Sequence, residues 1–178
     1  MTFTETRIPG AWIVDITPHY DERGFFAMTW VSSEFVARGL DGSLAQCNLA
    51  FNFRNGTLRG MHYQRAPHAQ VKLVRCVRGA VLDVIVDLRR DSATCRQWDS
   101  VELTAENRRM LYIPAGLAHG YLTLSDDAEV FYQASTPWAP QAEAGVRWND
   151  PAFGITWPRE PAVISERDAT WPLLKAES

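Results

Sequence analysis

The segment from residue 46 to residue 53 alternates between polar or small residues and apolar ones, with the sequence Gln46-Cys47-Asn48-Leu49-Ala50-Phe51-Asn52-Phe53. Successive side chains of a β-strand point to opposite faces, so this period-two pattern predicts a strand. One face carries three amides, and the other carries a thiol and three apolar side chains. We expect the apolar face to pack away from solvent. The amide face suits either bulk water or a polar ligand, and both alternatives remain open at this level.

Seven further segments have the composition and patterning of short strands, namely 57–64, 71–78, 80–88, 97–103, 110–113, 121–124 and 129–134. Gly79 separates two of them and predicts a tight bend. Ser32–Arg38 is predicted as a short helix capped by Ser32 or Ser33. The Pro- and Trp-rich stretch after Thr136 is predicted to wrap the strands as coil and short helix. Eight or more strands with short connections favour an all-β sandwich or jelly roll.

The bulk properties narrow the protein class. A length of 178 residues suits one domain, predicted to span residues 1–178. A net charge of −3 argues against a nucleic-acid partner, and no apolar run is long enough to cross a membrane. The first residues lack the pattern of a secretory signal. The spacing of Cys47, Cys76 and Cys95 fits neither a disulfide framework nor a zinc knuckle, which predicts reduced, buried thiols and a cytoplasmic location.

Several polar residues are candidates for chemistry. Arg59 and His62 are three positions apart, so a regular strand sends them to opposite faces, but a bulge at Gly60 would turn both toward one cavity. Lys72 lies in a predicted strand, where a buried ammonium is costly unless it meets an anion or a ligand. An edge lysine that extends into solvent is the alternative. His119 follows a predicted turn, and its role could be structural or catalytic.

The segment Leu58-Arg59-Gly60-Met61-His62-Tyr63-Gln64, followed by Lys72-Leu73-Val74, resembles the dTDP-4-dehydrorhamnose 3,5-epimerase family. The likeness runs almost end to end, through Ile8–Gly10, Asp21–Phe26, Asp83–Arg89, Ile113–Gly120, Asn149–Pro151 and Ser165–Asp168. So many ordered matches over the whole chain form a specific signal. The resemblance implies an isomerase with a cupin-type, double-sheet jelly roll, short peripheral helices and a C-terminal wrapping segment.

The resemblance also implies catalytic roles for four residues. His62 would take the proton from the carbon beside a ketone, and Asp168 would orient His62 and favour its protonated form. Tyr132 would return a proton to the opposite face of the sugar. Lys72 would stabilise the enolate oxygen, with His119 nearby. The chemistry demands these parts, because inversion needs a base and an acid on opposite sides, and a preplaced cation lowers the cost of the enolate.

A second set of residues is implied in substrate binding, namely Arg23, Phe26, Gln46, Asn48, Arg59, His119, Glu143 and Arg167. Arg59 suits a diphosphate because its planar fork can pair two oxygens. Arg23 is implied to come from a neighbouring chain, since an N-terminal segment of about residues 1–30 crosses to the partner in a homodimer of this family. The implied partner molecule is a nucleoside-diphosphate sugar, most simply one linked to dTDP.

The chain departs from the family pattern at several positions. Met28 stands where glutamate is usual, and Ala50 and Asn52 stand where small hydroxylated residues are usual. Gln133 and Arg167 each replace a lysine. None of these changes alters the implied acid, base or cation, so we expect the chemistry to be retained. They leave the exact sugar, and thymidine as the base, open.

The function predicted from these features is epimerisation of a nucleoside-diphosphate 4-keto-6-deoxy sugar at C3 and C5. An enzyme that inverts a single centre would use the same acid and base, so it remains an alternative. A non-catalytic cupin that binds a sugar nucleotide is a second alternative, although it would need neither His62 nor Tyr132. A metal-binding cupin would need H-x-H followed by a carboxylate and a distant histidine. Here that stretch is His62-Tyr63-Gln64, which predicts no metal and no cofactor.

Overall fold

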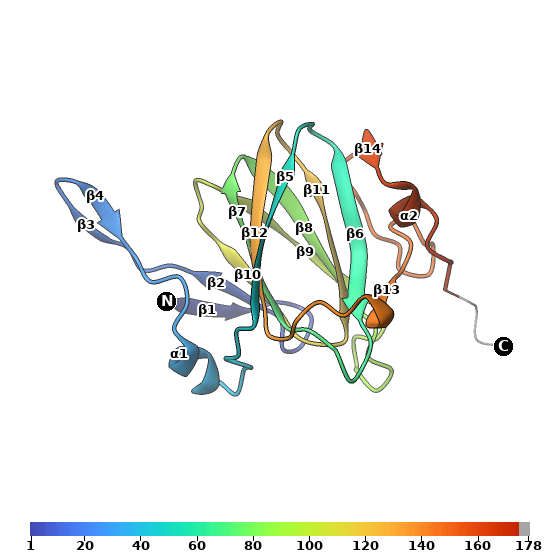
Figure 1. Cartoon of the computed structure of the whole chain (residues 1–178), viewed down its shortest axis with the longest axis horizontal. Helices are drawn as coiled ribbons and strands as arrows, with labels where there is room; N and C mark the ends of the chain where they lie inside the picture. The colour runs from blue at the N-terminus through green and yellow to red at the C-terminus, as the bar shows by residue number, and fades with distance from the viewer. Residues whose placement is uncertain (175–178) are drawn as a thin grey trace.

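The computed structural model describes residues 1–174 and forms a sandwich of two sheets with a projecting hairpin (Figure 1). The strands of the first sheet are, in spatial order, β1 (Thr2–Glu5), β2 (Trp12–Asp15), β10 (Met110–Ile113), β7 (Lys72–Arg78), β12 (Ala128–Ala134) and β5 (Gln46–Asn52). Those of the second are β13 (Glu143–Gly145), β6 (Thr57–Gln64), β11 (Leu117–Thr123), β8 (Ala80–Asp87) and β9 (Trp98–Thr104). Strands β3 (His19–Asp21) and β4 (Gly24–Phe26) form the hairpin.

The remaining elements are short. The short strand β14 (Val163–Ile164) pairs parallel to β6, whereas every other pairing in the described chain is antiparallel. The helical elements are α1 (Ser32–Val36), the 3-10 turn η1 (Pro140–Ala142) and α2 (Glu166–Ala169). Figure 1 shows α2 and β14 beside β6, at the opposite end of the molecule from the β3–β4 hairpin. The predicted class, an all-β double-sheet jelly roll with short peripheral helices, is confirmed.

The main core lies between the two sheets. Val74 and Val130 come from the first sheet, Ile85 and Leu103 come from the second, and all four side chains are fully or almost fully buried in one apolar cluster. Burial of such side chains contributes roughly 1.5–3 kcal/mol each, so this cluster holds the sheets face to face. The sheets are therefore a rigid frame for the polar residues that lie between them toward one end.

A second apolar cluster confirms the wrapping role of the C-terminal segment. Phe153 and Val146 pack with Met61 and Val84, which lie on strands of the second sheet, and Trp157 packs against the same cluster. The segment after residue 136 thereby covers the outer face of the second sheet. This contact also delivers α2 to the edge of β6.

Most predicted strands form within a few residues of the expected bounds, but three expectations were wrong. Helix α1 ends at Val36, and its N-cap is Val31, which has no hydrogen-bonding side chain. Neither Ser32 nor Ser33 caps the helix; both lie inside it, and Ser32 Oγ donates to the carbonyl of Gly42. The apolar face of β5 does not pack away within the chain, since Leu49 is 62% exposed and the adjoining Phe53 is 78% exposed.

The third error concerns the thiols, which were all expected to be buried. Cys76 is buried, but Cys95 is partly exposed and Cys47 is exposed; all three are free. The exposed Cys47 lies on the same uncovered face of β5 as Leu49. The described chain, residues 1–174, contains no helix that is both long and apolar enough to cross a bilayer.

Candidate active site

The two sheets enclose a partly open cavity of about 840 Å³. Strands β5, β6, β7, β11 and β12 supply most of its wall, and residues 163–168 close one side. Ten of the residues predicted from the sequence line it, namely Gln46, Asn48, Arg59, His62, Lys72, His119, Tyr132, Glu143, Arg167 and Asp168. These residues are separated by as many as 122 positions in the chain, and the fold brings them to one place.

A bulge in β6 explains how Arg59 and His62 face the same cavity. His62 pairs with His119 and Arg59 pairs with Tyr121, so two residues of β6 lie opposite one residue of β11. Gly60 occupies the bulge with φ of +134°, and a Cβ there would lie 2.5 Å from the Cα of Gly120. Only glycine fits such a conformation and such a close approach. The bulge predicted at Gly60 is confirmed.

His62 forms a short hydrogen bond with Asp168, in which Nε2 lies 2.6 Å from Oδ1. Asp168 is held in turn by helix α2, since its backbone N–H donates to the capping Ser165 Oγ, and its second oxygen accepts the N–H of Gly60 at 3.2 Å. With an ionised Asp168, Nε2 is the donor, which leaves the lone pair on Nδ1 of His62. The pair therefore presents one basic nitrogen in a fixed orientation.

The environment of Asp168 favours the ionised carboxylate. Burial alone would raise the pKa of this group, but the hydrogen bond and charge of His62, the Gly60 N–H and the Arg167 charge together lower the pKa below its usual value. Asp168 therefore remains a full negative charge at neutral pH, as a partner of a histidine that gains a proton must be.

Lys72 lies on β7 and faces the cavity. Burial lowers the pKa of its ammonium to about 8, against the opposing influence of Asp83 and Glu143. Its Nζ lies 6.0 Å from the centroid of the Tyr132 ring. Most of the Lys72 side chains therefore carry a charge at neutral pH, and that charge is poorly hydrated. Such a cation is suited to stabilise an anion that forms inside the cavity.

Tyr132 lies on β12, in the sheet opposite His62. The pKa of its phenol is raised, mainly by burial and to a smaller extent by the charge of Glu143, while the charge of Arg59 opposes this shift. The phenol is thus protonated at neutral pH and can act as a proton donor. A base from one sheet and an acid from the other face the same cavity.

Gln46 and Asn48 lie side by side on the inner face of β5. Gln46 Nε2 donates to Asn48 Oδ1 at 2.7 Å, and Gln46 Oε1 accepts the backbone N–H of Trp138 at 2.9 Å. Asn48 Nδ2 is buried and has no hydrogen-bond partner in the described chain. The predicted amide face of β5 thus lines the cavity, and it offers one unused donor.

Glu143 and Arg167 form an ion pair at the edge of the cavity, with 3.0 Å between Oε2 and Nη1. Arg167 is largely exposed, whereas Glu143 is mostly covered. His119 lies deeper, where its Nε2 is 3.0 Å from Oδ2 of the fully buried Asp83. His119 therefore lines the cavity and is also one half of a buried pair. The sequence left open whether its role is structural or catalytic.

Sequence reasoning missed several residues of this region, among them Asp83, Tyr121 and Trp138. Asp83 fixes His119, and a carboxylate among the apolar residues of β8 was the available signal. Tyr121 lines the cavity, and burial raises the pKa of its phenol to about 12. Trp138 lines the outer part of the cavity while its side chain is 56% exposed. Neither aromatic carried a signal, because tryptophans and tyrosines in this chain mostly serve packing.

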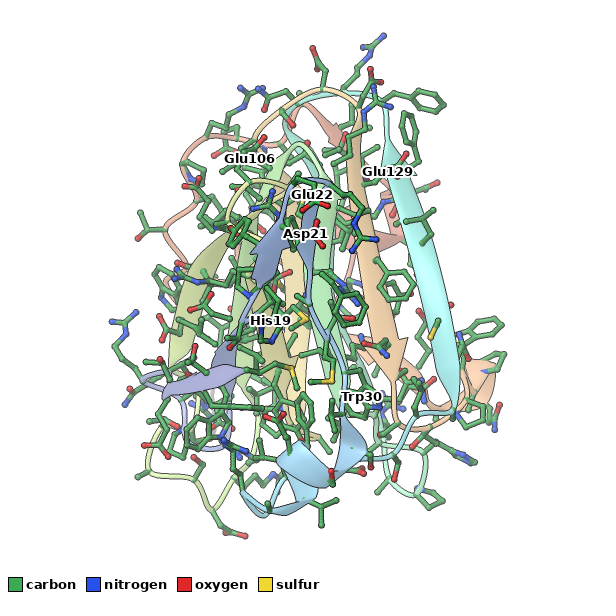
Figure 2. The ribbon with its side chains drawn as sticks, turned by 90° about the vertical axis from the view of Figure 1, so that its left-hand side faces the viewer. His19, Asp21, Glu22, Trp30, Glu106 and Glu129 are labelled. Carbon is green, nitrogen blue, oxygen red and sulfur yellow. The ribbon has the colours of Figure 1, made fainter. Side chains whose placement is uncertain are left out.

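Two predicted binding residues lie outside the cavity. Arg23 is at the turn of the β3–β4 hairpin and pairs with Asp21, and Phe26 is 72% exposed on β4. Figure 2 shows this hairpin projecting toward the viewer, with Asp21 and Glu22 near its tip and Trp30 further along, close to α1. A single chain therefore does not bring Arg23 or Phe26 to its own site. Residues 1–174 also contain no group of three His, Cys, Asp or Glu side chains placed to hold a metal ion.

Comparison with known proteins finds relatives that match almost the whole chain. The model of the dTDP-4-dehydrorhamnose 3,5-epimerase family matches residues 5–176. The enzyme of that name from Methanothermobacter thermautotrophicus is 42% identical over 176 residues, which cover 97% of this chain and 94% of the relative. The crystal structure of the Bacillus anthracis enzyme, with TDP and PPi bound, superposes with a TM-score of 0.93 at 37% identity and covers 97% of this chain and 99% of that one.

A third similar protein has a narrower activity. ChmJ, a 3'-monoepimerase from Streptomyces bikiniensis in complex with dTDP-quinovose, has a TM-score of 0.87 at 39% identity, over 94% of this chain and 85% of that one. The family match, the sequence identity and the shared fold extend over nearly the whole chain. The chain belongs to the dTDP-4-dehydrorhamnose 3,5-epimerase family of isomerases.

Proposed function

We propose that the protein inverts C3 and C5 of a dTDP-linked 4-keto-6-deoxy sugar by proton abstraction and reprotonation. The observation that carries this proposal is the placement of His62 and Tyr132 on opposing sheets around one cavity. A base and an acid on the same side would return the proton to the face from which it came. A pure binding protein would need neither group.

The proposed step begins at Nδ1 of His62, which takes the proton from the carbon beside the ketone. The C–H electron pair forms the enolate double bond, and the carbonyl electrons move to oxygen. Lys72 stabilises that oxyanion, which is the largest available contribution because the carbon acid is weak. Tyr132 then donates its hydroxyl proton to the other face of the carbon. Solvent returns a proton to the tyrosinate and accepts the one held by His62, which resets the site.

The substrate class is supported by charge and by the relatives. Arg59, Arg167 and the amides of β5 provide cationic and neutral donors for a diphosphate and a sugar. The Bacillus anthracis relative holds TDP and PPi, which is the anionic portion expected in this cavity.

We also propose that the protein acts as a cytoplasmic homodimer in which each hairpin completes the partner's site. The motivation is that Tyr20 and Phe26 are each 72% exposed, that Arg23 does not line the cavity of its own chain, and that the hairpin projects from the sandwich (Figure 1). Light scattering should give twice the chain mass of 20.1 kDa. A fully active monomer at micromolar concentration would exclude this arrangement.

Inversion of a single centre is the second candidate, and ChmJ is the observation that favours it. The two candidates share the same acid and base and differ only in how many carbons are presented to them. Ala50 alters the cavity wall without touching His62 or Tyr132, so it could affect sugar placement.

The test is incubation with a dTDP-4-keto-6-deoxyhexose in deuterated water, followed by NMR of the sugar. Each inverted carbon acquires one deuteron, because the Tyr132 hydroxyl exchanges with solvent. Label at both C3 and C5 supports the proposed function, label at one carbon supports the second candidate, and label at neither refutes both. In Tyr132→Phe, His62 can still form the enolate, so label is expected to enter with little inversion.

A further inference from the structure

Asn52 is a buried amide with a fixed orientation. It is the last residue of β5, its side chain is 2% exposed, and its Nδ2 donates to the carbonyl of Ala128 at 3.0 Å. This bond directs Oδ1 toward the space between the sheets. There Oδ1 accepts from Nε of Arg59 at 2.8 Å and from the hydroxyl of Tyr121 at 3.4 Å. Asn52 therefore connects a strand of the first sheet to two side chains of the second.

A second bond from the same strand restrains the guanidinium. Nη2 of Arg59 donates to the carbonyl of Phe51 at 3.2 Å. Two of the five N–H donors of Arg59 are thus used against β5, and the others remain for a ligand in the cavity that Arg59 lines. The planar fork is held at two points, so its orientation is determined.

Both acceptors of these bonds are neutral. An amide oxygen and a backbone carbonyl orient the guanidinium without cancelling its charge, and no carboxylate in residues 1–174 forms an ion pair with it. The full positive charge of Arg59 is therefore available to an anion. An aspartate at position 52 would have a similar shape but would place a negative charge against Nε.

We propose that Asn52 is a positioning residue that holds Arg59 ready to bind the diphosphate of the substrate. This proposal rests on the proposed function, because it assigns the anion at Arg59 to a sugar nucleotide. Asn52 itself does not line the cavity and acts through Arg59. Its loss should weaken binding while leaving the proton-transfer groups in place.

The test uses inorganic pyrophosphate as the probe, titrated calorimetrically into the full-length protein. Asn52→Ala is expected to bind roughly tenfold more weakly, the scale of one hydrogen bond to a charged group. With the sugar-nucleotide substrate, KM should rise by a similar factor while kcat changes less than about twofold, within the scatter of a contact not made to the reacting atoms. Gln133→Leu is the matched control, a buried amide on the neighbouring strand that does not line the cavity and should bind like wild type.

The decisive comparison is a double-mutant cycle with Arg59→Met. If Asn52 acts through Arg59, then Asn52→Ala should have almost no further effect on pyrophosphate binding in that background. Asn52→Asp, which keeps the side-chain shape, tests the same contact if the alanine variant does not fold. It should also weaken binding, because its carboxylate neutralises Arg59.

The outcomes distinguish the positioning role of Asn52 from the diphosphate contact of Arg59. An undiminished effect of Asn52→Ala in the Arg59→Met background overturns the positioning role, as does wild-type affinity in both Asn52 variants. If Arg59→Met itself bound pyrophosphate normally, the diphosphate contact would be wrong and the Asn52 proposal would fail with it. Deuterium exchange at C3 and C5 would still report the proposed reaction independently.

Discussion

Replacement of Asp168 by asparagine changes one group in the proposed base while keeping its shape. The carboxylate accepts two bonds, from His62 Nε2 and from the Gly60 N–H, each on its own oxygen. Asparagine has a single acceptor oxygen, so it can satisfy only one of these donors. If its NH₂ faces His62, then Nε2 must accept, and the ring proton moves to Nδ1. That tautomer blocks the nitrogen that should remove the substrate proton.

The expected magnitude follows from the bond that is lost. A hydrogen bond to a charged group contributes about 1.5–3 kcal/mol, and Asp168 is almost fully covered, with Nε2 and Oδ1 only 2.6 Å apart. Each 1.36 kcal/mol corresponds to about a tenfold change in rate. We therefore expect kcat/KM to fall about 10- to 100-fold, and further where the wrong tautomer dominates.

The assay is the initial rate of deuterium entry at the inverted carbons, with pyrophosphate affinity measured in parallel. Affinity should be retained, because Asp168 is on the base side of the site. Asp99→Asn is the matched control, since Asp99 pairs with Arg7 at 2.8 Å on β9 and does not line the cavity. If Asp168→Asn kept more than half of the wild-type rate, Asp168 would have no role in orienting His62.

The same variant should lose stability in a pH-dependent way. The pKa of Asp168 is lower in the folded protein than its unfolded value of about 3.9, so the carboxylate stabilises the fold above that value. This contribution is lost as the pH falls through the lower, folded pKa. The difference in unfolding free energy between wild type and Asp168→Asn should therefore be full at neutral pH and shrink on acidification below about pH 4.

Three other perturbations have defined outcomes. With a pKa of about 8 for Lys72, kcat/KM should fall above that pH, and Lys72→Met should be nearly inactive in the exchange assay. Lys72→Met should nevertheless have a higher Tm at neutral pH, because burial of the ammonium destabilises the fold below about pH 8. This cost declines as the pH rises from the folded pKa of Lys72 toward its unfolded pKa. An unchanged or lower Tm would contradict the expectation. Gly145→Ala should cost about 1–3 kcal/mol in denaturant unfolding, since its Cβ would lie 2.3 Å from Cε2 of Trp171; a neutral result would show that the indole moves freely. Activity should survive dialysis against a strong chelator, with elemental analysis as the check, and a loss restored by one divalent ion would disprove metal independence.

Most residues of the strands that line the cavity could be predicted from runs of strand-forming residues, and β5 also carries a period-two pattern. The first four residues of β11 were missed, because all seven of its residues are buried and show no alternation. β1 to β4, β13 and β14 were not predicted, since each has only two to four residues, and β13 and β14 form only by pairing with the distant strand β6. The outer face of β5 illustrates another limit. Its alternation indicates an apolar face, but no local pattern shows whether another surface covers Leu49 and Phe53.

The candidate site was predicted largely through motifs, and its geometry supplied the rest. Gly60 could be identified as a bulge from the spacing of Arg59 and His62, because strand alternation alone separates those two side chains. Asn52 was visible only as a departure from a family pattern. Its partner is seven residues further along the chain on the opposite sheet, so the contact depends on how the sheets pack.

The late position of Asp168 has a consequence for how the protein is made. All strands of both sheets, and most of the residues that line the cavity, precede it in the chain. Synthesis proceeds from the N-terminus, and domains tend to fold as their segments become available. A nascent or proteolytically shortened chain that ends before α2 would carry Arg59, Lys72 and Tyr132 but no partner for His62. Such a chain would have most of the residues that bind the substrate but no oriented base. During synthesis, the protein would therefore be able to bind its substrate before it could catalyse the reaction.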